Sequence, residues 1–189
     1  VAGGTVIIVA GSVTKQEVEK EVKKHFSHVP KTKKGTKSKT KDSQTKPAIV
    51  LKHKATDQTH FVLGVRTFDI FDKRNATLSV LATLLGAGMS SRLFIKLREE
   101  MGVAYYVRAF NEPSLDYGAF QISAGVNNAR TEEVIKEILI ECTRLKTELV
   151  SDRELAKVKT FMIGNAKLSL EATDDNDNDI STTTTIQTT

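Results

Sequence analysis

The sequence has 189 residues, which is the length of one domain or of one domain with a tail. Its 39% hydrophobic and 27% charged residues are typical of a globular protein and argue against the disordered and fibrous classes. The single cysteine, Cys142, excludes an intramolecular disulfide, and because no run of about 18 apolar residues occurs, we expect no membrane partner.

The chain begins with Val-Ala-Gly-Gly, which contains neither an initiator methionine nor the charged and apolar segments of a signal peptide. We therefore expect the sequence to be a part of a longer protein. The sequence does not define the cellular compartment, and we expect a cytoplasmic location.

The net charge of +5 is concentrated in one segment. Residues 31–46 hold seven lysines and one acidic residue, and the rest of the chain holds 21 basic and 22 acidic residues. This Lys/Thr/Ser-rich run has no aromatic residues, so it lacks the stacking groups that hold single-stranded nucleic acids. We therefore expect residues 31–46 to form a solvated, mobile loop, and we expect no nucleic-acid partner.

Hydrophobic periodicity and turn residues predict alternating strands and helices along the chain. Two helix starts carry a capping box, formed by Thr14 with Glu17 and by Ser151 with Glu154. The expected strands are residues 5–10, 48–54, 59–67, 103–110 and 118–126, with a loop at 111–114. The expected helices are residues 14–30, 74–85, 90–100, 131–148 and 151–172.

This order, β-α-β-β-α-α-β-β-α-α, places hairpins between most neighbouring strands. It predicts an α+β fold with a mixed, largely antiparallel sheet and helices packed on one face. We expect one domain over residues 1–173, in which Gly86 and Gly88 make a tight turn that lets two helices meet. Residues 174–189 are rich in Asp, Asn and Thr, and we expect a disordered or truncated tail there.

The most specific segment is residues 84–107, LLGAGMSSRLFIKLREEMGVAYYV. Its Gly-rich turn, Met-Ser-Ser-Arg-Leu-Phe, Leu-Arg-Glu-Glu, glycine and aromatic strand resemble the second-domain signature of M16 zinc metallopeptidases, the pitrilysin, insulinase and mitochondrial-processing-peptidase type. The strand and helix at 5–30 and the final helices also resemble that domain, so the resemblance covers residues 5–172. It implies an M16/LuxS-like metallohydrolase domain, the C-terminal, non-zinc-binding member of a domain pair.

M16 enzymes bind zinc in their other domain through His-x-x-Glu-His and a further Glu, and the Glu of the motif is the general base for the attacking water. That motif is absent here, where the four histidines are His25, His28, His53 and His60. Only His25 and His28 are close in sequence, and no acidic third ligand lies near them. We therefore expect no metal or other cofactor in this chain, zinc in a missing partner domain, and no peptidase activity of this chain alone.

The resemblance assigns catalytic roles to Arg98 and Tyr105, which are seven positions apart, as in the family, with Gly102 between them. It implies that both face the zinc and hydrogen-bond the substrate backbone near the scissile bond. An arginine and a phenol hydroxyl can hold a peptide carbonyl and stabilise developing oxyanion charge. The alternative to these catalytic roles is a structural one, in which Arg98 is a solvated surface charge and Tyr105 packs within its strand. In a regularly alternating strand, Tyr106 would point away from Tyr105.

We therefore expect the chain to be the substrate-binding half of an M16-type zinc endopeptidase that acts on peptides or unfolded segments. The zinc-binding domain would lie in the same chain or in a heterodimer partner. A non-catalytic, M16-like structural subunit of a complex is the first alternative, and a polyanion-binding module that uses the lysine-rich loop is the second. The sequence leaves the substrate, the cleavage preference and the oligomeric state open.

Overall fold

A computed structural model describes residues 5, 7–9, 11–30, 35–169 and 184–186. The chain forms two compact units, the terminal unit (residues 1–38 and 163–189) and the sheet unit (residues 39–162). In the terminal unit, β1 (Ile7–Val9) pairs antiparallel with β5 (Thr184–Ile186). The helix α1 (Lys15–Phe26) begins at the predicted capping box, which is confirmed. The rest of the tail expected at 174–189 lies outside the described residues.

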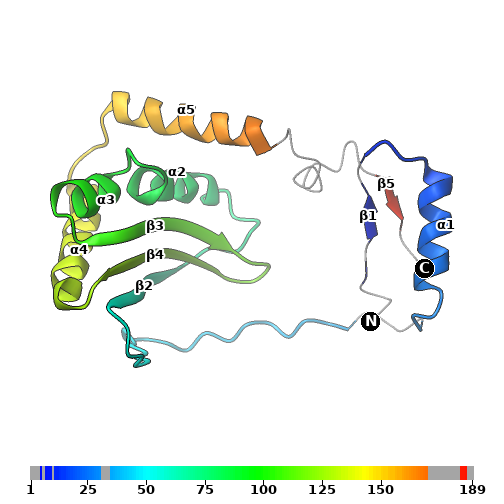
Figure 1. The fold of residues 1–189 in the computed structure, drawn as a ribbon, viewed down its shortest axis with the longest axis horizontal. Helices are drawn as coiled ribbons and strands as arrows, with labels where there is room; N and C mark the ends of the chain where they lie inside the picture. Colours follow the sequence, from blue (N-terminus) through cyan, green and yellow to red (C-terminus); the bar gives the residue numbers. More distant parts are fainter. Residues whose placement is uncertain (1–4, 6, 10, 31–34, 170–183, 187–189) are drawn as a thin grey trace. The chain divides into compact units, whose positions relative to one another are not determined.

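The sheet unit contains a three-stranded antiparallel sheet in the order β2-β4-β3 (Figure 1). These strands are β2 (Gln58–Thr67), β3 (Ala104–Pro113) and β4 (Gly118–Asn127). Alternate residues of the central strand are buried against the helices, namely Phe120, Ile122, Ala124 and Val126. The expected α+β fold with helices on one face is confirmed, and every strand pair among the described residues is antiparallel.

The helices of the sheet unit, together with the last described helix as far as Met162, supply the rest of the apolar core. They are α2 (Asn75–Gly86), α3 (Arg92–Phe94) with the π-helix η2 (Ile95–Glu100), α4 (Thr131–Thr147), and α5 (Asp152–Ser169). A short 3-10 turn, η3 (Asn128–Arg130), links β4 to α4. The helices' buried contributions are Ala82, Leu84, Leu85, Leu93, Leu97, Val134, Ile138 and Val158.

The other side of the sheet, which we call the outer face, is more exposed and more polar. The register places His60 and Val62 of β2 opposite Gly125 and Ser123 of β4, and these residues alternate with the buried positions of each strand. Side chains from β3 complete the outer face, namely Tyr106, Arg108 and Phe110. The sheet unit therefore presents one face to its helices, and the outer face is the more exposed of the two.

Two predicted segments are wrong. Residues 48–54 form no strand, and Ile49, Val50 and Leu51 are 92%, 96% and 91% exposed. A strand needs a neighbouring edge for its backbone hydrogen bonds, and none of the described strands pairs with this segment. The loop expected at 111–114 is also wrong, because β3 continues to Pro113, opposite Gly118.

The described part of the lysine-rich loop, residues 35–46, has no regular secondary structure and is exposed. It makes a few polar contacts: the Thr40 N–H donates to Asp116 Oδ2 at 2.7 Å, and Arg66 bonds to Asp42 and Gln44. The mobility of residues 31–46 stays a prediction.

Brief trypsin treatment is expected to cleave first within residues 31–46, because a protease needs an extended, locally unfolded substrate segment. A compact fragment that contains the core of the sheet unit should persist. Mass spectrometry of the earliest fragments checks this expectation. First cuts at Arg92, Lys96 or Arg98 would show that the predicted domain boundaries are wrong.

Candidate functional site

Arg98 lies in the last turn of the π-helix η2, which continues from α3 at Ile95. Gly102 then adopts a φ of +63°, a left-handed conformation that favours glycine. The Val103 N–H donates back to the Leu97 C=O at 2.9 Å and closes the helix end. The helix therefore ends at the predicted glycine, while the π-helix has no signal in the sequence. Single π-helical turns occur frequently at functional sites.

The side chain of Arg98 is exposed, whereas its neighbour Leu97 is fully buried and anchors the turn. The Arg98 guanidinium lies over the Phe94 ring, 5.2 Å from the ring centroid. This contact orients the guanidinium without consuming its N–H donors. Among the described residues, no carboxylate pairs with Arg98, so its donors are available to a ligand.

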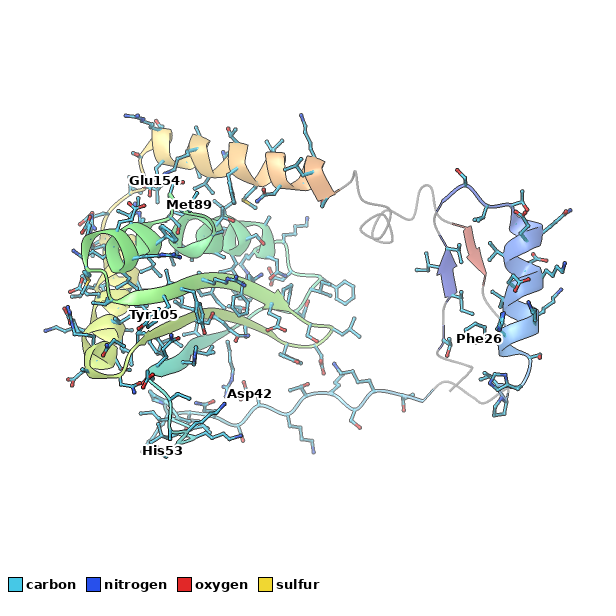
Figure 2. All side chains as sticks on the ribbon, in the orientation of Figure 1. Phe26, Asp42, His53, Met89, Tyr105 and Glu154 are labelled. Atoms are coloured by element: carbon cyan, nitrogen blue, oxygen red, sulfur yellow. The ribbon has the colours of Figure 1, made fainter. Side chains whose placement is uncertain are left out.

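Tyr105, which Figure 2 labels near the start of β3, is the extra residue of a β-bulge in that strand. Ala104 and Val107 are both buried on the helix side, so the two tyrosines between them lie on the outer face. The expectation that Tyr106 points away from Tyr105 is therefore wrong. Bulges break strand alternation and re-aim side chains, and they are common next to active sites. The Tyr105 side chain is 52% exposed.

Tyr106 has defined partners on the outer face. Its hydroxyl lies 3.2 Å from His60 Nδ1, and the two rings stack with centroids 5.7 Å apart. Gly125 lies between them in the register, and a Cβ there would be 2.5 Å from Tyr106 Cε1. His60 therefore has a structural role that sequence reasoning missed, because its partner is 46 residues away.

The fold brings Arg98 and Tyr105 to the two sides of the Gly102 turn. No hydrogen bond joins the two side chains, and the described residues contain no hydrogen-bonding partner for the Tyr105 hydroxyl. Both groups therefore present unoccupied donors. A guanidinium and a phenol can each donate a hydrogen bond to a carbonyl or carboxylate oxygen, whatever the side chain of the bound molecule.

A hollow of about 780 Å³ lies beside Tyr106, between the end of α2 and β3. Gly86 closes one side, and a Cβ there would lie 2.3 Å from the Ala109 nitrogen, so Gly86 lets α2 approach a strand. Gly88 has a φ of +83° and packs against the ring of Phe161. The turn at 86–88 therefore lies against β3 at Gly86 and against the Phe161 ring of α5 at Gly88.

Comparison with known proteins identifies the family. The model of the family described as the peptidase M16 inactive domain matches residues 2–162. The chain belongs to the M16 peptidases. The predicted resemblance is therefore confirmed over most of the chain. The word inactive in the description of this M16 domain agrees with the missing His-x-x-Glu-His motif.

The relatives of this M16 domain are longer proteins. The chain is 32% identical over 168 residues to YmxG of Bacillus subtilis, an uncharacterized zinc protease, and the match covers 89% of this chain and 40% of YmxG. A protease from Helicobacter pylori has a similar structure, with a TM-score of 0.69 and 26% identity, over 89% of this chain and 42% of that one. The M16 inactive domain from Pseudomonas fluorescens shares the fold, with a TM-score of 0.56, 24% identity and coverage of 59% and 27%.

The M16 motif segment also contains Arg92, whose role sequence reasoning missed. Arg92 binds Glu154 through two hydrogen bonds of 2.8 and 2.7 Å, and it donates to Glu141 at 2.8 Å. The three side chains are 10–24% exposed. The bond to Arg92 lowers the pKa of Glu154 below its usual value. Arg92 therefore fastens α3 to α4 and α5, and it holds the segment that leads to Arg98.

Within the parts of the chain that the structure describes, no group of three or more His, Cys, Asp and Glu side chains could hold a metal ion. His25 contacts Glu21 at 3.3 Å and is exposed, and the described residues around it provide no third ligand. Likewise, none of the described helices of this M16 domain has the length and hydrophobicity of a membrane span.

Metal analysis of the purified chain is expected to find substoichiometric zinc, and the chain alone should show no metal-dependent peptidase activity. The reason is that one His–Glu contact on an exposed helix face provides too few ligands for a tetrahedral zinc site. One tightly bound zinc per chain, measured by atomic emission after dialysis, would contradict this prediction.

Proposed function

We propose that this M16 domain is the substrate-binding half of a zinc-dependent endopeptidase. It completes a chamber that holds a peptide backbone close to a zinc ion carried by a separate M16 domain. That domain lies in the same polypeptide or in a heterodimer partner.

The length and names of the relatives support a separate zinc domain. The chain spans 40% of the Bacillus protein, which leaves space there for another domain, and that protein is named a zinc protease. The Helicobacter protein is titled a protease, and this chain covers 42% of it. When bound in its own domain, the zinc would supply an activated water for peptide hydrolysis.

The observation that carries the proposal is the pair Arg98 and Tyr105. Both are exposed at one helix–strand junction, and the described structure gives neither the guanidinium nor the phenol a hydrogen-bonding partner. The Phe94 contact and the bulge orient them, and preorganised donors of this type stabilise negative charge on a carbonyl oxygen during attack. Because they bind backbone atoms, they favour peptides or unfolded segments as substrates.

The test is the activity of the complete two-domain protein with Tyr105 replaced by phenylalanine. A strong loss of activity with normal zinc content supports the proposal. A parent protein that binds zinc but cleaves no peptide would favour a structural subunit instead. Binding to nucleic acid that falls steeply with salt would favour the polyanion-binding alternative.

A further inference from the structure

The outer face contains a row of three residues that cross the whole sheet. In the register, Gly125 of the central strand lies opposite His60 of β2 on one side and opposite Tyr106 of β3 on the other. The Tyr106 hydroxyl and His60 Nδ1 meet above Gly125 at 3.2 Å. This row belongs to no part of the proposed substrate-binding pair.

Only glycine fits in the centre of this row. A Cβ at position 125 would lie 2.5 Å from Tyr106 Cε1 and 3.1 Å from His60 Nδ1. Both rings therefore settle onto the backbone of β4, where they stack at an interplanar angle of 22°. The Tyr106 ring is consequently held by a ring contact, a hydrogen bond and the strand beneath it.

The row lies directly beside the bulge in β3. Strand pairing shifts between Ala104 and Tyr106, so Tyr105 is the residue without a partner in the ladder. Tyr105 has no ladder pairing and its side chain is 52% exposed, so its direction depends on the pairing of its neighbour Tyr106. If the bulge moved by one residue and left Tyr106 unpaired, Tyr105 would take the position opposite Gly125 and its side chain would be redirected.

We infer that His60, Gly125 and Tyr106 are positioning residues that keep Tyr105 at the bulge and so fix the direction of its side chain on the outer face. The inference rests on the proposed function for its kinetic consequence, but its structural consequence is independent of that function. His60 holds the Tyr106 ring by a hydrogen bond and by stacking. The paired Tyr106 in turn fixes the position of the neighbouring bulge residue, Tyr105.

The structural test uses the small number of tyrosines. The chain has three tyrosines and no tryptophan, so ¹³C-labelled tyrosine rings give few NMR signals. In the chain with His60→Ala, the ring signals of both Tyr106 and Tyr105 should shift or broaden, and that of Tyr117 should stay unchanged. His60→Asn, which keeps a polar atom near Nδ1, should largely restore both signals. His53→Ala, at an exposed histidine, is the matched control. A change confined to Tyr106 would overturn the inference.

The kinetic test is a double-mutant cycle in the complete two-domain protein. Tyr106→Phe should lower kcat/KM about threefold or more in the parent, mainly through kcat, and should have little effect when Tyr105→Phe is already present. Equal losses in both backgrounds, or no loss in the parent, would contradict a role through Tyr105. If Tyr105→Phe alone is fully active, the proposed function fails, and the NMR result still decides the positioning role. Thermal unfolding of each variant separates these effects from misfolding.

Discussion

In the proposed two-domain enzyme, Arg98→Ala and Tyr105→Phe are each expected to lower kcat/KM by about tenfold or more, which corresponds to about 1.4 kcal/mol or more of lost transition-state stabilisation. Loss of one oxyanion-binding donor elsewhere typically costs about 2.7–4 kcal/mol, so the effect is expected to be large. Steady-state kinetics with an unstructured peptide substrate measure it.

The folded state should survive both substitutions. Arg98 is exposed and Tyr105→Phe removes only a hydroxyl that has no described partner, so neither change opens a large cavity or leaves a buried group unpaired. Zinc content should stay at the parent value because neither residue is a ligand.

Matched controls are available on the same chain. Arg153→Ala removes an exposed arginine from the first turn of α5, and Tyr117→Phe removes a hydroxyl at the turn before β4. Both should stay within about twofold of the parent, as surface substitutions usually do. If both Arg98→Ala and Tyr105→Phe are fully active, neither residue contributes to catalysis. Arg98 is then a solvated charge and Tyr105 a packing side chain.

Arg92→Met is expected to destabilise the domain by about 3 kcal/mol, the lower end of the range for breaking a buried ion pair. The lower end applies because Arg92, Glu141 and Glu154 retain 19%, 10% and 24% side-chain exposure. Methionine fills a similar volume, so the effect reports the unpaired carboxylates rather than a cavity. The melting temperature should fall by about 6–12 °C for a domain of this size.

The pH dependence gives a second measurement of the same network. Arg92 lowers the folded-state pKa of Glu154 from its ordinary value of 4.5, so this ion pair stabilises the domain above that pH. The stabilisation is lost as the pH falls from 4.5 through the folded pKa. The stability difference between parent and Arg92→Met should therefore shrink in acid. A difference that is constant from neutral to acidic pH would rule out this role of the pair, and Arg153→Met is the exposed control.

The sequence by itself determined those features whose signals are local in the chain. Thr14 and Glu17 are three residues apart and form the predicted capping box, with the Thr14 N–H bound to Glu17 at 2.8 Å. Gly102 ends its helix because its φ of +63° suits glycine. The motif at 84–107 identified the family, and the missing His-x-x-Glu-His motif could be read without a structure.

The tertiary structure decided the features that depend on partners distant in sequence. The apolar residues 48–54 read as a strand but have no described neighbour to pair with, whereas Asn111 and Glu112 read as a loop but pair with β4. Arg92 meets its carboxylates across 62 and 49 residues, and Tyr106 meets His60 across 46. Strand alternation predicts opposite faces for Tyr105 and Tyr106, and only the pairing of β3 with β4 reveals the bulge that puts both on one face. Periodicity describes one chain segment at a time, whereas register and ion pairing depend on what the rest of the fold places beside it.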